Sequence, residues 1–341
     1  MADSLQNVER ELARLRMDDE GAVGLRASVL NLIVVADEGS AAGINRTISE
    51  LADRHPSRAI VLIPDPEDQA GLDISLSAFC SLRRGANRNV CSEQVTVRAE
   101  GPTALHLESV AGPLRIPDLP TFLFYPGRFS ASSPEFLRLA DRVILDSAAD
   151  CERTFGELER LIKTPDMPPA GDLQWAAISP WRALLRELFG SPDRRQELLR
   201  IREVEVMRTA DGECRALLLA GWLSSSLGWT PKGSSHSETG RELLFEGPSG
   251  EITLRTSPSP SDARLAVVTL RSEDCVFRVS RHKELSEARL SVELGDRRVV
   301  DRSVRIGRFD LGATLGEELK YRGRDETFER SLEKVMEILR S

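Results

Sequence analysis

The residues best suited to bind a charged ligand are three arginines within one short turn, Arg83, Arg84 and Arg88. Glycine and asparagine accompany them in Arg83-Arg-Gly-Ala-Asn-Arg-Asn89, a composition typical of a turn between two paired strands. Guanidinium groups form paired hydrogen bonds with phosphates and carboxylates. The turn is therefore predicted to bind an anionic ligand or a carboxylate-rich protein surface. A solvated turn without a ligand is the alternative interpretation.

A second candidate is Tyr125-Pro-Gly-Arg128, which follows an apolar run predicted to be a strand. Ligands of open α/β sheets bind beyond the carboxyl ends of the strands, and this segment offers an aromatic ring beside an arginine. Pro117, Pro120 and Pro126 stiffen the surrounding backbone and lower the entropy cost of binding. Tyr125 and Arg128 are therefore candidate binding residues, and a simple strand-to-helix turn is the alternative.

The third candidate is a tryptophan-rich segment, Asp172–Gly190. A helix is predicted from about Pro180 to Phe189, with Ser179 as its cap and Gly190 as a left-handed stop. Its apolar residues fall on one stripe, which predicts burial against the rest of the protein: Trp181, Leu184, Leu185, Leu188 and Phe189.

Trp175 precedes that helix, in a stretch predicted to be non-helical, where a large aromatic must find its own pocket or partner. Tryptophan and arginine are enriched where proteins anchor their partners. Trp175, Trp181 and Arg182 are therefore candidate partner-binding residues. Packing in the core is the other interpretation of Trp181 and comes first.

Motifs for catalysis, cofactor binding or metal binding are missing from the sequence. The turn after the first predicted strand, Asp37–Gly43, lacks the G-x-G-x-x-G pattern, and its two carboxylates would repel a phosphate. The four histidines have no ligand spacing to one another or to cysteine: His55, His106, His236 and His282. We therefore predict no catalytic residue, no cofactor and no metal.

The chain has five cysteines, an odd number, with no C-x-x-C motif. This usage is typical of a reducing compartment in which cysteines act as small apolar residues. Cys80 and Cys91 are the one pair expected to approach each other, across the predicted hairpin.

Composition limits the class of protein. The 341 residues carry a net charge of −8, which argues against nonspecific binding to nucleic acid. The N-terminal twenty residues are charged rather than leader-like, and no apolar run reaches the length of about 20 residues that spans a bilayer. We therefore expect a cytoplasmic protein with no membrane or nucleic-acid partner.

The first half alternates strands and helices. Val29–Ala36 and Arg58–Ile63 are predicted strands on either side of a helix capped by Ser40, which indicates a parallel βαβ unit. Ile74–Leu82 and Cys91–Arg98 are predicted to form an antiparallel hairpin. The expected fold is an α/β N-terminal domain with a mixed, partly parallel sheet.

The second half changes to short alternating strands with two covering helices, Glu213–Leu227 and Asp325–Leu339. Lys232–Gly240 and Ser257–Asp262 are predicted to be mobile loops. This half is expected to be an α+β domain with a mainly antiparallel sheet. The predicted organisation is an N-terminal helix at 1–25, an α/β domain at 26–170 and the α+β domain at 171–341, whose residues 172–200 form a helical linker.

Six segments of the sequence occur in the same order as in one known protein family. They are Asp172–Gly190 itself with His55-Pro-Ser-Arg58, Cys91-Ser-Glu-Gln-Val95, Pro117-Asp-Leu-Pro120, Asp141-Arg-Val-Ile-Leu-Asp146 and Leu217-Leu-Leu-Ala-Gly-Trp222. Together they resemble the OpcA family, the glucose-6-phosphate dehydrogenase assembly proteins, over about residues 27 to 229. The resemblance implies a bacterial, non-enzymatic protein whose partner is glucose-6-phosphate dehydrogenase, and in some members a link to thiol-redox control.

Three functional hypotheses follow. The first is an assembly factor or allosteric activator that supports the dehydrogenase and the oxidative pentose phosphate pathway, as the resemblance implies. The second is an enzyme that acts on a nucleotide or sugar phosphate, with the turn of Arg83, Arg84 and Arg88 as a phosphate clamp. The third is a sensor in which an anion bound at that turn alters the interface with a partner.

Overall fold

The computed structural model describes residues 2–17, 25–67, 69, 71–82, 89–129, 133–237, 240–259, 261–281, 287–307 and 310–341. The chain divides into two compact units, and each contains its own sheet. The first unit comprises Met1–Asp146, Leu161–Gly171 and Leu315–Arg324. The second comprises Ser147–Arg160, Asp172–Thr314 and Asp325–Ser341.

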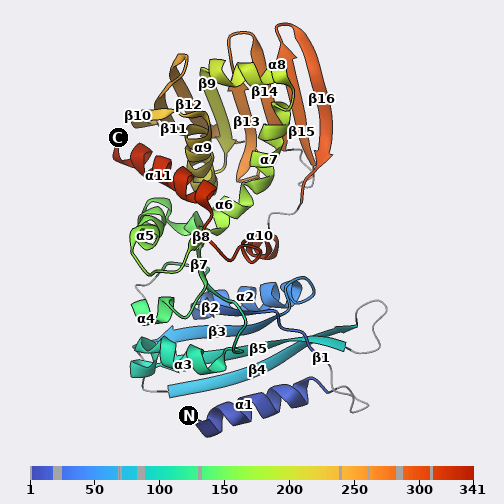
Figure 1. Cartoon of the computed structure of the whole chain (residues 1–341), viewed down its shortest axis with the longest axis vertical. Coiled ribbons are helices and arrows are strands. Elements are labelled where there is room, and N and C mark those ends of the chain that lie inside the picture. Colours follow the sequence, from blue (N-terminus) through green and yellow to red (C-terminus); the bar gives the residue numbers. More distant parts are fainter. Residues whose placement is uncertain are drawn as a thin grey trace. The chain divides into compact units, whose positions relative to one another are not determined.

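The first unit is built on an eight-stranded sheet of order β1-β5-β3-β2-β6-β7-β8, with β4 paired to β5 (Figure 1). The central strands are buried along nearly their whole length, because helices cover both faces of the sheet, as parallel sheets require. The strands are β1 (Leu25–Arg26), β2 (Leu30–Val35), β3 (Ser57–Asp65), β4 (Gly71–Leu82), β5 (Asn89–Glu100), β6 (Thr121–Tyr125), β7 (Arg142–Leu145) and β8 (Ala170–Asp172).

The pairing of β2 with β3 is parallel and that of β4 with β5 antiparallel, as the sequence predicts, so the mixed sheet is confirmed. On one face Asn45 of α2 accepts a hydrogen bond from Gln94 of β5. On the other face α1 packs on β4 and α3 packs on β3. The helices of this unit are α1 (Ala2–Leu15), α2 (Glu38–Leu51), η1 (Gly101–Leu105), α3 (Leu107–Leu114) and α4 (Pro134–Leu137).

The second unit is built on an eight-stranded sheet of order β10-β11-β12-β9-β13-β14-β15-β16, in which only the pairing of β12 with β9 is parallel. The mainly antiparallel sheet is therefore confirmed. Its strands are β9 (Glu203–Arg208), β10 (Thr230–Ser237), β11 (Gly240–Gly247), β12 (Gly250–Pro258), β13 (Leu265–Arg271), β14 (Cys275–Arg281), β15 (Glu287–Leu294) and β16 (Arg297–Arg305).

Helices pack on this sheet, with α7 against β14 and β15 and α9 against β9 (Figure 1). The helices are η2 (Ser147–Ala149), α6 (Leu173–Ala177), α7 (Ser179–Leu188), α8 (Pro192–Glu197), η3 (Leu198–Arg200), η4 (Ala210–Gly212), α9 (Glu213–Leu227) and α11 (Glu326–Arg340). Two more helices, α5 (Cys151–Lys163) and α10 (Leu311–Glu318), contain points at which the chain passes between the units.

The close approach of α9 and α11 explains the glycine in Leu217-Leu-Leu-Ala-Gly-Trp222. A Cβ atom at Gly221 would lie 2.3 Å from the carbonyl oxygen of Ser331, which is backbone and cannot move aside. The predicted end of α9 at Gly228 is confirmed, since Gly228 adopts the left-handed conformation with φ of 67°.

Several local predictions are wrong. Asp37, not Ser40, caps α2, because its carboxylate accepts from the Ser40 amide at 2.7 Å. Gly190 is not left-handed, and Ser179 is the first residue of α7 rather than its cap, although the predicted helix itself is confirmed as Ser179–Leu188. Trp175 lies in the short helix α6, which Asp172 caps. Part of the predicted loop at Lys232–Gly240 is strand β10.

Candidate functional site

Ligands of open α/β sheets bind at the carboxyl edge, and in the first sheet carboxylates occupy this edge at the start of α2. Asp37 caps the N-terminus of α2, and Glu38 in the first turn pairs with Arg98 at 2.6 Å. The amide groups that would cradle a phosphate at this helix end therefore face a negatively charged side chain of the protein itself.

The segment Tyr125-Pro-Gly-Arg128 leaves the same edge. A Cβ atom at Gly127 would lie 3.8 Å from Oδ2 of Asp37, so the two turns are neighbours. The Tyr125 ring is buried and contacts Phe129 edge-on, with centroids 4.9 Å apart. Arg128 is exposed. Of these two predicted site residues, Arg128 presents its side chain at the surface, whereas the tyrosine contributes to the core.

Trp175 lies inside the second unit and is only 1% exposed. Its indole N–H donates to Oδ2 of Asp325 at 2.9 Å, and the Arg182 guanidinium carbon lies 3.5 Å from the ring centroid. Phe328 contacts the same indole, with centroids 5.5 Å apart. The structure thus brings Trp175 and Arg182 together, as an internal cation–π pair. Trp181 is also buried, in agreement with the core interpretation.

Arg83, Arg84 and Arg88 lie outside the described residues. The strands that flank them, β4 and β5, are described and form the predicted hairpin. The turn therefore remains a predicted anion-binding or partner-binding site.

Sequence reasoning missed two buried arginines that organise the first unit. Arg58 begins the apolar part of β3 and donates to Oε2 of Glu93 at 2.7 Å, to Glu9 at 2.9 Å and to the carbonyl of Leu114 at 3.1 Å. Burial by itself lowers the pKa of Arg58, but the hydrogen bond to Glu9 and the charge of Glu93 outweigh it, and the pKa is raised. Arg58 thereby ties α1 and α3 to the sheet.

Arg142 has the same position at the start of β7. It donates to Oε2 of Glu318 at 2.8 Å and to the carbonyl of Gly323 at 2.8 Å, and its side chain is fully buried. A Cβ atom at Gly171 would lie 2.4 Å from this guanidinium and 2.3 Å from the Glu318 carboxylate, so a larger residue there would displace the ion pair. Arg142 fastens the returning segment Leu315–Arg324 to the first unit. An arginine opening an apolar strand run was the signal that could have identified both residues.

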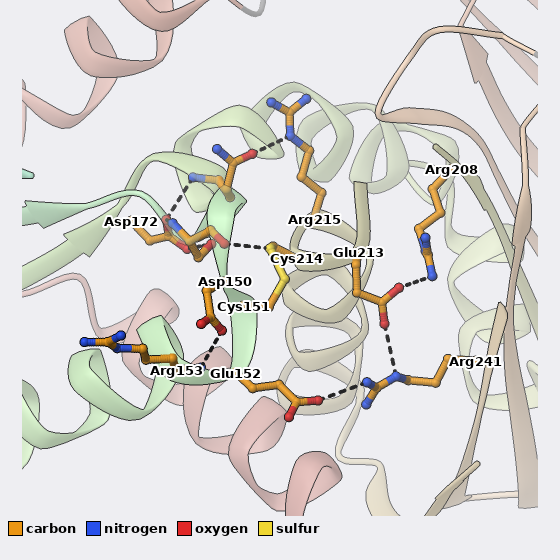
Figure 2. Close-up of a disulfide and its surroundings, with 12 residues drawn as sticks. Asp150, Cys151, Glu152, Arg153, Asp172, Arg208, Glu213, Cys214, Arg215 and Arg241 are labelled. Atoms are coloured by element: carbon orange, nitrogen blue, oxygen red, sulfur yellow. Dashed lines mark hydrogen bonds and ion pairs between the residues drawn. A yellow bond between two sulfur atoms is a disulfide. The ribbon is translucent and has the colours of Figure 1, made fainter. Parts of the chain in front are cut away.

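The cysteines form two disulfides, which corrects the prediction of reduced, apolar cysteines. Cys80 and Cys91 pair across the β4–β5 hairpin, with Cα atoms 4.1 Å apart, so the expected approach of this pair is confirmed. Cys151 and Cys214 join the first turns of α5 and α9, with Cα atoms 5.3 Å apart (Figure 2). The sequence separation of 63 residues concealed the second pair.

The Cys151–Cys214 disulfide lies within a dense polar cluster of the second unit (Figure 2). Sγ of Cys214 lies 2.9 Å from the carbonyl oxygen of Ser147, which is a contact rather than a hydrogen bond because a disulfide sulfur carries no proton. Asp172 accepts from the amide and the hydroxyl of Ser147, at 3.1 and 2.7 Å. These bonds join the segment of Asp172 to the start of α5.

On the other side of this disulfide, Glu213 lies between two arginines (Figure 2). Arg241 pairs with Glu213 at 3.0 Å and with Glu152 at 3.1 Å, and Arg208 pairs with the second oxygen of Glu213. Two guanidinium groups are thus balanced by two carboxylates. The cluster is built to hold α5, α9 and β11 together and has no excess positive charge for an anion.

Metal and membrane sites find no support in the described residues. No group of three or more His, Cys, Asp and Glu side chains there could hold a metal ion. Among the same residues, every helix is too short or too polar to cross a lipid bilayer.

His55 is half-buried against α10, and both burial and the charge of Lys320 lower its pKa.

Solved structures share the fold. A mutant of KijD10, a 3-ketoreductase from Actinomadura kijaniata, in complex with TDP-benzene and NADP, has a TM-score of 0.52 at 9% identity, over 92% of this chain and 98% of that one. The same enzyme in complex with NADP has a TM-score of 0.51 at 10% identity, over 91% and 97%. At such identities the likeness concerns the fold alone.

Related sequences carry a shared name. A Synechocystis protein named OxPP cycle protein OpcA is 32% identical over 205 residues, which are 58% of this chain and 42% of that protein. A Nostoc punctiforme protein of the same name is 32% identical over 207 residues, or 57% and 43%. The match thus spans less than half the length of these curated relatives.

Family models match both halves of the chain. Residues 48–163 match the N-terminal domain, and residues 168–332 the C-terminal domain, of a family described as a glucose-6-phosphate dehydrogenase subunit. All six sequence segments that carry the resemblance lie within these two matches. The chain belongs to the OpcA family of glucose-6-phosphate dehydrogenase assembly proteins.

Proposed function

We propose that this chain is a non-catalytic binding protein that engages glucose-6-phosphate dehydrogenase and promotes its assembly or its active conformation. It would act in the bacterial cytoplasm, where it supports the oxidative pentose phosphate pathway. The observation that carries the proposal is the match of both halves to the two domains of a glucose-6-phosphate dehydrogenase subunit. The names of the relatives refer to the same pathway.

The structural roles of residues in the segments that resemble the family support a binding role. Arg58, Glu93 and Arg142 form buried ion pairs, Trp175 binds Asp325, and Gly221 permits the contact of α9 with α11. These residues build the two units and leave no cluster with the geometry of a general base and nucleophile among themselves. Fold alone does not confer the activity of the oxidoreductases that it resembles.

The physical requirement for an activator is differential affinity. The protein must bind the competent state of the dehydrogenase more tightly than the incompetent state. A tenfold shift between these states needs a difference of only about 1.4 kcal/mol. One or two well-packed side chains can supply that difference.

The proposal is tested by titrating the purified chain into glucose-6-phosphate dehydrogenase from the same organism. NADPH formation gives the activity, and light scattering gives the mass of the complex at each ratio. We expect saturable activation with formation of a complex of defined stoichiometry. Neither binding nor a rate change, with both proteins folded, would rule the proposal out.

The matched control addresses the enzyme and sensor hypotheses. The chain alone is incubated with glucose 6-phosphate or NADP, and its thermal midpoint and any turnover are measured. Turnover without the dehydrogenase would favour an enzyme. A thermal shift that also changes the affinity for the dehydrogenase would favour a sensor, because coupling between two ligands is reciprocal.

A further inference from the structure

Strand β4 of the first unit offers an open hydrogen-bonding edge. In the described part of the chain it pairs with β5 alone and lies at the margin of the sheet (Figure 1). The Cα atoms of Cys80 and Cys91 are 4.1 Å apart, which is the spacing of a non-hydrogen-bonded antiparallel pair. Because the register of β4 with β5 is unbroken, every second residue of β4 has the same orientation as Cys80. The backbone N–H and C=O groups that point outward, away from β5, are therefore those of Leu72, Ile74, Leu76, Ala78 and Cys80.

Natural edge strands are protected by shortness, charge, a bulge or proline, or by a covering helix or loop. Strand β4 lacks the first four of these features, and α1 packs against it on the face that carries Leu72 and Ile74. β4 has twelve residues, and its register with β5 is continuous, without a bulge. Asp73 is its only charged residue, and it contains no proline. Such a strand is a template for another extended segment.

An apolar groove lies on one face of this edge. It has a volume of about 540 Å³ and lies where α1, β4, η1 and α3 meet. Leu72 and Ile74 of β4 line it, together with Val8 of α1 and Val110 of α3. Leu72 is 50% exposed. The groove therefore leaves room for apolar side chains of a strand added next to β4.

The opposite face of the same edge is polar and acidic. There Asp73, Ser75 and Ser77 alternate along β4 with Leu72, Ile74 and Leu76, of which Leu72 and Ile74 line the groove. Arg98 on the neighbouring strand pairs with Glu38, and its pKa is raised by Glu38 first and also by the charges of Asp73 and Glu100, so three carboxylates act on one guanidinium group. The carboxylate of Glu100 rests over Gly71, where a Cβ atom would lie 2.2 Å from Oε2. The Gly71 end of the edge thus complements a basic residue.

We propose that β4 binds an extended segment of glucose-6-phosphate dehydrogenase by strand addition. The segment alternates apolar residues, which enter the groove, with polar ones, and carries a lysine or arginine opposite Asp73. Main-chain hydrogen bonds supply affinity and the alternating side chains supply specificity. This inference rests on the proposed function for the identity of the partner.

Hydrogen exchange on the unmodified complex is the first test. Chain and dehydrogenase are mixed at saturation, and amide exchange is compared with that of the chain alone. We expect exchange at Leu72, Ile74, Leu76 and Ala78 to slow by at least about tenfold. A complex that forms without protection of β4 would overturn this inference and leave the proposed function standing.

Two pairs of variants provide the second test. Ala78→Pro removes an outward N–H without removing a bond to β5, and Ala78→Val keeps it. Asp73→Lys reverses the charge, and Asp73→Asn only neutralises it. We expect Ala78→Pro and Asp73→Lys to weaken binding by about tenfold or more, and the control variants by less than about threefold. Equal affinities within each pair would contradict the proposal.

Other occupants give different outcomes. If the chain alone forms dimers and β4 becomes protected with rising concentration, a second copy occupies the edge and the proposal is wrong. If no complex with the dehydrogenase forms under any condition, both this inference and the proposed function fail.

Discussion

Arg58 and Glu93 lie opposite each other on neighbouring parallel strands, with a guanidinium nitrogen 2.6 Å from a carboxylate oxygen and both side chains fully buried. One residue comes from His55-Pro-Ser-Arg58 and the other from Cys91-Ser-Glu-Gln-Val95. Two separate segments shared with the family therefore meet in one ion pair. Arg16 adds a second contact to Glu93 at 3.3 Å.

Breaking this pair should destabilise the first unit. Glu93→Gln or Arg58→Ala leaves an uncompensated buried charge or polar group, and we expect a loss of about 3–5 kcal/mol for Arg58→Ala. Chemical unfolding followed by circular dichroism measures it. The double variant Arg58→Met/Glu93→Leu removes both charges and should recover part of the loss, because Arg16 still loses its contact with Glu93 and Glu9 its contact with Arg58. Equal stability of the single variants and the wild type would contradict this account.

Gly221→Ala should destabilise the second unit by about 1–3 kcal/mol, because the new methyl group collides with the backbone of α11. Gly156 is the matched control, since it also lies within a helix and a Cβ atom there would meet nothing within 4 Å. Gly156→Ala should stabilise by about 0.4–1 kcal/mol through the unfolded chain. The two thermal midpoints should therefore move in opposite directions.

Trp175→Phe should cost about 1–2 kcal/mol, because Asp325 loses the indole donor. Asp325 also caps α11 through its other oxygen, which accepts from Thr327 and Phe328. Asp325→Asn should therefore be milder than Asp325→Ala. If Trp175→Phe instead leaves stability unchanged and abolishes binding of the dehydrogenase, the residue acts at an interface.

Stability should fall as the pH is lowered through the titration range of histidine. Burial and Lys320 lower the pKa of His55 in the folded protein below its ordinary value of 6.5. The unfolded chain then binds a proton before the folded protein does, so stability decreases as pH falls through 6.5 toward the folded pKa. Comparing unfolding at pH 7.5 and 5.5 should show a smaller decrease for His55→Gln. An identical pH dependence would exclude this residue as its source.

The cysteine pairs can be counted directly. Thiol titration of the unfolded, non-reduced protein should detect Cys275 alone, and after reduction all five cysteines should react. The double variant Cys151→Ser/Cys214→Ser removes the disulfide that closes the longer loop, and we expect it to lower the free energy of unfolding by about 2–5 kcal/mol. Because disulfides are rare in a reducing cytosol, the same titration on protein trapped inside cells tests the proposed compartment. Five reactive thiols without reduction would contradict the pairing seen here.

Local pattern was sufficient for most of the secondary structure. The apolar run of β2, the hairpin of β4 and β5 and the helix Glu213–Leu227 could be predicted because each depends on periodicity and on nearby turn residues. The parallel pairing of β2 with β3 could be predicted from the helix between them, because parallel strands are joined by a crossover connection of this kind. The predicted helix boundaries were wrong where two nearby side chains could each cap the helix, as Asp37 and Ser40 could at the start of α2.

Only the tertiary structure decided which partners the polar and charged side chains bind. The partner of Arg58 is 35 positions away, that of Trp175 is 150 away and that of Arg142 is 176 away. The pairing of Cys151 with Cys214 also joins distant positions, which are 63 residues apart in the sequence. An isolated sequence shows donors and charges but not which are satisfied internally, because satisfaction depends on contacts that form only when distant segments pack together.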